Sequence, residues 1–237
     1  MTPLSHTYWH PTDIHGHIVR LPSHRAIQWL RDPTFERERI RTMAQVIQPD
    51  HVVYDIGAEQ GDMSALIASW VPDGGVVLVE PNPKVWPCIR ATFEENGLPH
   101  PIASFVGFCA AESGEVYGTQ YWPGDVPDII DPAAGFAHLA EQDDIDRASV
   151  DDLCDLLDTR PDVITIDVEG AELEVLKGAT HTLTNKRPHV FVSVHPEFIR
   201  HHFGGTAADV LNHMSGLDYR AHFLAADHEL HFWFEPS

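Results

Sequence analysis

Basic side chains are scarce in this 237-residue chain, where 15 lysines and arginines stand against 36 aspartates and glutamates. The resulting net charge of −21 disfavours a nucleic-acid backbone or an anionic membrane surface as a partner. No apolar run approaches the roughly 20 residues of a membrane span, and the N-terminus lacks the basic-then-apolar order of a secretory signal. We therefore expect a cytoplasmic protein whose partner is neither a membrane nor a nucleic acid.

Cysteine is scarce too. Cys88, Cys109 and Cys154 lie far apart, without the spacing of a metal site or a disulfide framework. They predict reduced, partly buried thiols, as is usual in the cytoplasm. The length suits one α/β domain with a substantial core and some appendages, and a homo-oligomer is compatible with it.

The most informative stretch runs from His51 to Glu80. It opens with a short apolar run ending at Asp55, which predicts a buried parallel strand. Gly57 and Gly61 follow in a tight loop, where glycine lets the backbone turn and approach a ligand closely. A helical apolar pattern and a second apolar run then lead to Glu80. This order is typical of the nucleotide-binding half of a doubly wound sheet, where the terminal carboxylate holds a ribose diol.

The charges around this loop favour one class of ligand. Asp55, Glu59 and Asp62 crowd the loop, and no lysine or arginine occurs between Arg41 and Lys84. Carboxylates repel a pyrophosphate, so a dinucleotide is disfavoured. The same carboxylates suit a ligand that carries an ammonium and a sulfonium group. The sequence therefore favours S-adenosylmethionine as the cofactor.

Residues 1–31 show no regular periodicity, so we expect an irregular N-terminal extension before a domain at 32–237. Its five histidines match no zinc spacing and are expected at the surface. The functional alternative is a lid over the cofactor pocket. A helix is predicted from Asp32, which is a suitable N-cap. The charged run from Glu36 to Arg39 is expected to face solvent, although either of these two residues could reach the cofactor.

A third strand is predicted over 102–106, ending where the adenine ring of such cofactors lies. Phe108 is a candidate wall of the adenine slot, with ordinary core packing as the alternative. Residues 112–150 are rich in proline, glycine and aspartate and predict an acidic insertion near the substrate side. Tyr121 and Trp122 are its candidate acceptor contacts, and a plain surface loop is the alternative.

The second half of the chain predicts two more strands with helices around them. The strand over 163–166 ends at Asp167, and the strand over 190–194 ends at His195. The helix before them, at 150–158, should turn Val150, Leu153, Leu156 and Leu157 inward, and a second helix is expected over 172–177.

The runs at 219–224 and 230–234 predict a terminal hairpin. Strands with crossovers followed by a hairpin are typical of the class I methyltransferase sheet. The predicted fold class is therefore α/β: a doubly wound, Rossmann-like sheet, mostly parallel, with an antiparallel terminal hairpin strand.

Four blocks of sequence carry a family resemblance: Asp55-Ile-Gly-Ala58 with Gly61, Val79-Glu-Pro-Asn-Pro83, Ile166 to Gly178, and His195-Pro196 followed by Gly216 and Tyr219. Over about Gln45 to Tyr219 the chain resembles the FkbM-type S-adenosylmethionine-dependent methyltransferases. Two positions depart from the usual pattern of that family, because Glu59 stands in place of Asn and Thr165 in place of Lys. The resemblance implies methylation of hydroxyl groups on sugars and natural-product precursors.

The residues expected to contact the cofactor are Asp55, Gly57, Ala58, Glu59, Gly61, Glu80, Pro81, Phe108 and Asp167. Catalytic candidates lie at the carboxyl ends of the central strands, namely His195, Asp167 and Glu169. The ordinary pKa of histidine suits a base at neutral pH, and either acid could orient it, take the proton or bind the acceptor hydroxyl. The structural alternatives are a backbone partner for His195 and helix capping by Asp167, Glu169 and Glu172. Asp167 and His195 could instead share a divalent metal such as Mg²⁺.

Three functions compete at this level. The first is an O-methyltransferase acting on a small hydroxylated acceptor. The second is an NAD-dependent oxidoreductase on the same sheet, which the acidic glycine loop and the terminal hairpin disfavour. The third is a non-catalytic relative that binds a nucleoside or a partner protein, having lost its chemistry through Glu59 and Thr165.

Overall fold

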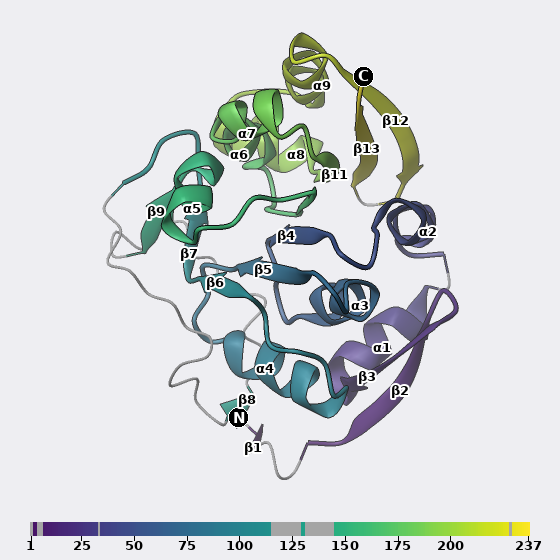
Figure 1. The fold of residues 1–237 in the computed structure, drawn as a ribbon. Coiled ribbons are helices and arrows are strands. Elements are labelled where there is room, and N and C mark those ends of the chain that lie inside the picture. The colour runs from purple at the N-terminus through teal and green to yellow at the C-terminus, as the bar shows by residue number, and fades with distance from the viewer. Residues whose placement is uncertain (1, 4–6, 33, 115–128, 131–144, 228) are drawn as a thin grey trace.

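A twisted sheet forms the centre of the protein (Figure 1). The computed structural model describes residues 2–3, 7–32, 34–114, 129–130, 145–227 and 229–237. Within these residues the central sheet has seven strands. In spatial order they are β12 (Tyr219–Ala226), β13 (Leu230–Pro236), β11 (His189–Val194), β10 (Val163–Ile166), β4 (Val52–Ile56), β5 (Gly75–Val79) and β6 (Ala103–Phe105).

The pairing of these strands confirms the predicted fold class. β6, β5, β4, β10 and β11 run parallel, while β13 lies antiparallel between β11 and β12. The chain starts in the middle at β4, builds outward through β5 and β6, and then returns to place β10 on the other side of β4. The switch point of the sheet therefore lies between β4 and β10, where α/β proteins of this kind bind their ligands.

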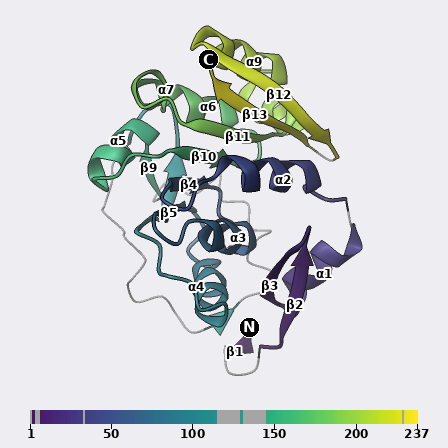
Figure 2. The same cartoon turned by 45° about the vertical axis from the view of Figure 1, so that its right-hand side comes forward.

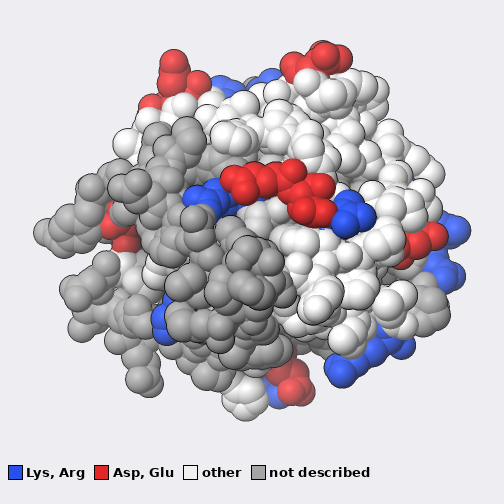
Figure 3. Space-filling model, turned by 90° about the horizontal axis from the view of Figure 1, so that it is seen from below, with Lys and Arg blue, Asp and Glu red and all other residues white. Residues whose placement is uncertain are grey.

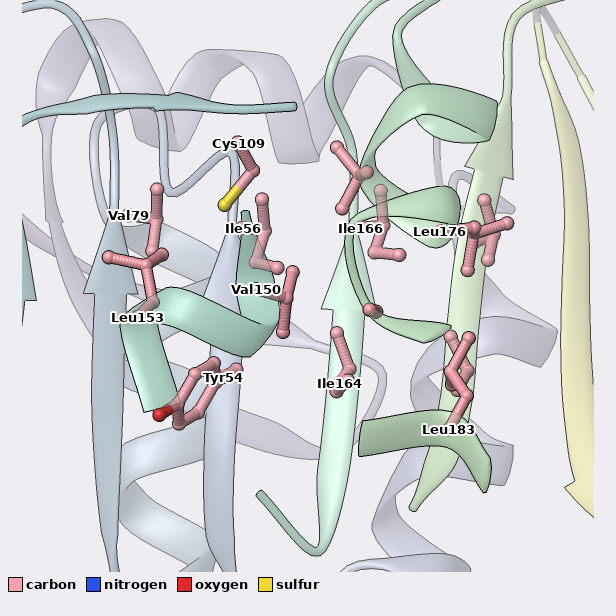
Figure 4. Packing of buried hydrophobic residues seen from close by; sticks show 14 of the residues in the cluster. Tyr54, Ile56, Val79, Cys109, Val150, Leu153, Ile164, Ile166, Leu176 and Leu183 are labelled. Carbon is pink, nitrogen blue, oxygen red and sulfur yellow. The ribbon is translucent and has the colours of Figure 1, made fainter. Parts of the chain in front are cut away.

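Helices cover both faces of the sheet, and each face has its own apolar cluster. One face carries α2 (Arg37–Val46), α3 (Asp62–Trp70) and α4 (Trp86–Glu95). The other carries α5 (Val150–Leu156), α6 (Glu172–Lys177), α7 (Thr180–Asn185) and α9 (Ala207–Gly216). Figure 4 shows side chains of the second cluster, among them Ile164 and Ile166 of β10 facing Leu176 and Leu183. Burial on both faces explains why these strands read as unbroken apolar runs.

The N-terminal extension is regular, which corrects the prediction of an irregular segment. β2 (Trp9–Ile14) and β3 (His17–Pro22) form an antiparallel hairpin, and α1 (Ser23–Arg31) follows at once. The hairpin turns at His15 and Gly16, both of which have positive φ. This unit contacts α3 and α4, and it lies beside them in both views (Figures 1 and 2). Periodicity failed to find the hairpin because its strands alternate buried and exposed residues only in part.

Several boundaries differ from the predicted ones. α2 begins at Arg37 rather than near Asp32, because residue 36 adopts a left-handed conformation before it. Leu156 is exposed instead of facing inward. α7 and a π-helical turn at Ile199–Phe203 were not predicted. Of the predicted insertion at 112–150, the structure describes a strand, β9 (Asp146–Ala148), paired in parallel with β7 (Gly107–Cys109).

A third two-stranded pair joins β1 (Thr2–Pro3) to β8 (Ile129–Ile130). Tyr121 and Trp122 lie outside the described residues. In the part of the chain that the structure covers, no helix has both the length and the apolar character to span a membrane.

Candidate active site

The glycine loop between β4 and α3 lies at the switch point of the sheet. Gly57 and Gly61 both have positive φ, which explains the glycines. A Cβ at Gly57 would collide with the backbone carbonyl oxygen of Asp167 at the end of β10, and one at Gly61 would press on the α4 backbone at Ile89. Close packing within the protein, and not only access for a ligand, therefore requires glycine at these positions.

The two carboxylates predicted around the loop are both buried, but they face different partners. Glu80 accepts hydrogen bonds from the backbone N–H of Glu59 at 2.9 Å and of Asn82 at 2.8 Å. Its burial raises the pKa to about 8. Asp55 accepts a 2.5 Å hydrogen bond from the Ser64 hydroxyl on α3, and burial raises its pKa to about 6. Glu80 thus ties the loop to the end of β5, and Asp55 ties β4 to α3.

The acids of the loop are not without a basic partner, which corrects the electrostatic argument from sequence. Arg25 of α1 is buried and donates to both carboxylate oxygens of Glu59, at 2.7 and 2.6 Å. It also donates to Asp62 at 2.9 Å, and the Trp29 indole N–H donates to Asp62 at 2.5 Å. The gap in basic residues along the sequence is therefore filled in space from the N-terminal helix.

A second arginine enters the site at the end of β10. Arg39 of α2 donates to the Thr165 hydroxyl at 2.6 Å, to Glu36 at 2.8 Å and to Asp167 at 3.3 Å. Arg39 and Glu36 are buried, so the prediction that their run faces solvent is wrong for these two residues and right for Glu38, which is exposed. In the usual family pattern a Lys at position 165 would bring a positive charge on this strand, and here the charge comes from Arg39 of α2.

His195 lies between two buried carboxylates at the end of β11. Its Nδ1 donates to Glu172 of α6 at 2.7 Å, and its Nε2 lies 2.8 Å from the Glu229 carboxylate. Asp167 approaches the same Nε2 at 3.7 Å. Glu172 also accepts the backbone N–H of Gly170, so it holds the turn before α6 and orients the imidazole as well.

These contacts set the protonation of the group. Burial alone would lower the pKa of His195, but the carboxylates of Glu172, Glu229 and Asp167 outweigh it and raise the pKa to about 10. The pKa of His195 is therefore not the ordinary value on which its role as the base was predicted. Burial and the charge of Glu229 raise the pKa of Asp167 to about 6, against the opposing effect of Arg39. Its side chain is 31% exposed, whereas those of His195, Glu172 and Glu229 are 9%, 0% and 2% exposed.

The same residues have the composition of a metal site. Asp167, His195 and Glu229 each offer one ligand atom, and these atoms lie within 4.8 Å of one another. Glu172 would fix the tautomer of the histidine ligand through its other nitrogen, as carboxylates commonly do in metal sites. The residues therefore fit a divalent ion, with Glu229 added to the predicted pair. The described N-terminal histidines have other partners: His15 bonds the Phe35 carbonyl and His24 the Gln60 amide.

Carboxylates outnumber cations over the whole site. Figure 3 shows a row of acidic atoms across the middle of one face, with basic atoms at either end. Beside the glycine loop an open pocket of about 260 Å³ lies between α1 and the turn into α2. It is lined by Arg25, Gln28, Trp29, Arg31, Asp32, Phe35 and Glu59.

The remaining predicted residues lie at the strand ends, with fewer contacts. Glu169 is exposed at positive φ, and no hydrogen bond joins it to another described residue. Phe108 is partly exposed on β7, and Pro81 follows Glu80 directly. The Ala58 N–H donates to the Val79 carbonyl at 3.2 Å. Their roles toward a cofactor or an acceptor stay predictions.

Comparison with known proteins identifies this arrangement. The family described as "Methyltransferase FkbM domain" matches residues 55–221, which is most of the chain. The chain belongs to the FkbM methyltransferase family. The predicted family and fold class are thereby confirmed, and S-adenosylmethionine is the methyl donor that FkbM membership implies. The oxidoreductase alternative falls.

Two kinds of relative support this. The FkbM chain is 26% identical to the hexuronic acid methyltransferase AglP of Haloferax volcanii over 189 residues, covering 77% of this chain and 73% of that one. The crystal structure of an FkbM methyltransferase from Methylobacillus flagellatus superposes with a TM-score of 0.52 at 15% identity. That match covers 90% of this chain, which spans only 62% of that protein.

The fold is shared more widely. A precorrin-6y C5,15-methyltransferase from Geobacter metallireducens has a TM-score of 0.50 at 13% identity, covering 85% of this chain and 88% of that one. Fibrillarin from Methanococcus jannaschii has a TM-score of 0.52 at 10% identity, covering all of this chain and 86% of that one. At these identities the likeness shows the fold alone.

Proposed function

We propose that this protein transfers the methyl group of S-adenosylmethionine to a hydroxyl of a small molecule, such as a sugar or a natural-product precursor. The main observation behind this proposal is the partly exposed carboxylate of Asp167, which lies at the switch point beside the glycine loop. The hexuronic acid methyltransferase supports a sugar acceptor, because it is similar over three quarters of this chain. The acidic balance of the chain supports a small molecule over a nucleic acid.

The cofactor would lie across the ends of β4 and β5. Glu80 would hold the ribose hydroxyls, since each of its oxygens retains a lone pair beside the backbone N–H that it already accepts. Gly57 and Ala58 would lie beneath the methionyl part, near Asp55 and Glu59. The excess of carboxylates over cations favours a ligand with ammonium and sulfonium charges, even with Arg25 present.

Methyl transfer is an in-line displacement in which the acceptor oxygen attacks the methyl carbon and sulfur leaves with the bonding electrons. Holding the three atoms in line supplies most of the acceleration, about 7–11 kcal/mol in well-oriented reactions. Proton removal from the hydroxyl contributes a further factor of about 10²–10⁴. Asp167 is the base that the site offers, because an acceptor reaches it more easily than the buried His195, whose nitrogens both face carboxylates.

His195 would then act through position and charge. Between Glu172 and Glu229 it carries a proton at neutral pH and faces Asp167 at 3.7 Å. This positive charge keeps Asp167 ionised in spite of its burial. If a divalent ion is bound, Asp167, His195 and Glu229 would hold it, and its charge would acidify the acceptor hydroxyl.

The cofactor assignment is tested by calorimetric titration of S-adenosylmethionine into wild type, Glu80→Ala and Glu94→Ala. A neutral hydrogen bond contributes about 0.5–1.5 kcal/mol, so losing one to each of the two ribose hydroxyls in Glu80→Ala should weaken binding roughly 5- to 150-fold. Glu94, an exposed glutamate on α4, serves as the control and should bind like wild type. If Glu80→Ala binds S-adenosylmethionine as tightly as wild type, Glu80 does not hold the ribose. If wild type does not bind it at all, the cofactor assignment is wrong.

A non-catalytic relative remains the second candidate, because Glu59 departs from the usual family pattern. Labelled S-adenosylmethionine incubated with the protein and small-molecule extracts distinguishes the two functions. Transfer of label to an extract component supports the enzyme. Cofactor binding without transfer in any extract supports the non-catalytic role.

A further inference from the structure

The pocket between α1 and the turn into α2 borders the place assigned to the methionyl part of the cofactor, because Glu59 belongs to both. Figure 2 shows α1 and α2 following one another near α3. Six of the seven lining residues come from 25–35, and the seventh, Glu59, belongs to the glycine loop. The N-terminal residues precede the range matched by the family, 55–221. Apart from Glu59, the lining residues therefore lie outside the matched family domain.

The wall formed by α1 is fixed against the glycine loop. His24 bonds the Gln60 amide at 2.5 Å, Arg25 holds both oxygens of Glu59, and Trp29 donates to Asp62. Because two of these contacts are buried ion pairs or charge-assisted hydrogen bonds, α1 does not shift without leaving a buried carboxylate unpaired. A ligand in this pocket is therefore held at a set place relative to the loop.

The pocket borders the glycine loop at one wall and the turn into α2 at the other. Glu59 at the first wall donates its backbone N–H to Glu80, the proposed ribose ligand. Phe35 at the second wall directly precedes Glu36, which pairs with Arg39, the arginine that reaches Asp167. A ligand between these walls lies beside the glycine loop, and α2 links the second wall to Asp167 through Arg39.

The side chains that line the pocket offer two kinds of contact. Trp29 and Phe35 pack edge to face, with ring centroids 5.3 Å apart, and supply an apolar wall. Gln28 and Asp32 supply hydrogen-bonding groups, and Asp32 already orders the turn by accepting from Thr34. An apolar wall with a few polar groups is the usual composition of a small-molecule site.

Arg31 is the distinctive residue of the pocket. The guanidinium of Arg25 is already paired with Glu59 and Asp62. By contrast, no hydrogen bond or ion pair joins Arg31 to another described residue. A planar guanidinium matches a carboxylate with two parallel hydrogen bonds. The pocket therefore has a cation available for an anionic group.

We infer that this pocket binds the methyl acceptor as a hydroxylated ring that carries a carboxylate, with Arg31 pairing the carboxylate. The inference rests on the proposed function, whose acceptor class it narrows. The acceptor ring lies against Trp29 and Phe35, and its hydroxyls face Gln28 and Asp32. Arg31 is a specificity residue here, and Asp167 remains the base.

The test compares the binding of D-glucuronate and D-glucose, which differ in the carboxylate, by calorimetry with S-adenosylhomocysteine at saturation. Wild type should bind glucuronate at least tenfold more tightly, and salt should reduce the difference. Arg31→Gln should abolish the preference. Arg41→Gln, which changes an exposed arginine outside the pocket, should keep it.

Three results would overturn the inference. They are equal binding of the two sugars by wild type, an unchanged preference in Arg31→Gln, and loss of glucuronate binding when S-adenosylhomocysteine is added. The last result would assign the pocket to the methionyl end of the cofactor. The binding of S-adenosylhomocysteine itself is measured first, so a failure of the methyltransferase proposal is recorded separately from a failure of the pocket.

Discussion

Two buried arginines, Arg25 and Arg39, enter the site from the N-terminal quarter of the chain, and they meet their carboxylates differently. The two terminal nitrogens of Arg25 donate to the two carboxylate oxygens of Glu59. Arg25 and the Trp29 indole both donate to Asp62. Every charged group of that cluster has a partner. Around Arg39, by contrast, Glu36, Asp167, Glu172 and Glu229 face one guanidinium and two imidazoles, those of His195 and His231.

The two clusters differ in how completely their charged groups are paired. Buried charges are stable when they are fully paired, as at Arg25. An excess of carboxylates instead shifts pKa values, and such shifts are common at catalytic groups. The Arg25 cluster therefore fixes the glycine loop, whereas the Arg39 cluster leaves Asp167 partly exposed, as its proposed role as the base requires.

The largest expected effect is on catalysis at the Arg39 cluster. Asp167→Asn keeps the shape of the side chain and removes the base, so we expect kcat to fall about 10²–10⁴-fold. The dissociation constant for S-adenosylmethionine should change little. Glu197→Gln, an exposed acid near His195, is the matched control. A fall in kcat of less than tenfold for Asp167→Asn would show that another group takes the proton.

The next effect is on stability. Arg39→Met removes the cation from buried Glu36 and leaves an uncompensated charge, which should lower the free energy of unfolding by about 3–5 kcal/mol. Arg41→Met breaks an exposed pair with Glu38 on the same helix and should cost about 0–1 kcal/mol. Urea denaturation measures both, and equal costs would contradict the buried role of Arg39.

A smaller cost is expected at the Arg25 cluster, because Glu59 is partly exposed and Trp29 still serves Asp62. Arg25→Gln should lower the free energy of unfolding by about 2 kcal/mol. It should also weaken S-adenosylmethionine binding, since the loop loses its support. Adding Asp62→Asn should restore part of the stability, and a double variant that is less stable than Arg25→Gln alone would refute this account.

The pH dependence of the rate distinguishes the two clusters further. Because the pKa of Asp167 is raised to about 6, kcat should rise with pH below 6 and level above it. Arg39→Lys keeps the positive charge but loses the paired N–H groups of the guanidinium. The pH at which kcat reaches half of its plateau should therefore shift less in Arg39→Lys than in Arg39→Met. A limb near the ordinary pKa of aspartate would argue against Asp167 as the base.

A separate effect concerns stability at alkaline pH. The folded pKa of His195, about 10, lies above its ordinary value of 6.5. Its stabilising contribution is therefore complete below pH 6.5 and is lost as the pH rises through 10. Thermal unfolding between pH 7 and 10 should show a decline that His195→Gln flattens. An equal decline in both proteins would assign it to other groups.

The local sequence pattern was enough to predict the strands of the sheet and the glycine loop. Apolar runs ending in Asp55, Glu80, Asp167 and His195 placed the strand ends, because parallel strands bring their carboxyl ends to one edge. The balance of charges in the site could not be predicted in this way. Arg25 and Arg39 are ordinary residues on their helices, and only tertiary packing brings them to the acids.

Glu229 shows the same limit in another way. It follows a hairpin turn, where acids are common, and nothing in the sequence pairs it with His195, 34 residues earlier. Glu172 did have a signal, since it lies in the most distinctive block of the chain, but helix capping explained it equally well. The pKa of His195 could not be assigned without these two partners.

The contact of Gly57 with the Asp167 carbonyl has a further consequence. With no side chain between them, the ends of the neighbouring strands β4 and β10 lie at a spacing set by their own backbones, and that spacing also separates the proposed cofactor loop from the proposed base. A bulkier residue there should push the two strands apart and abolish turnover, even where the fold survives.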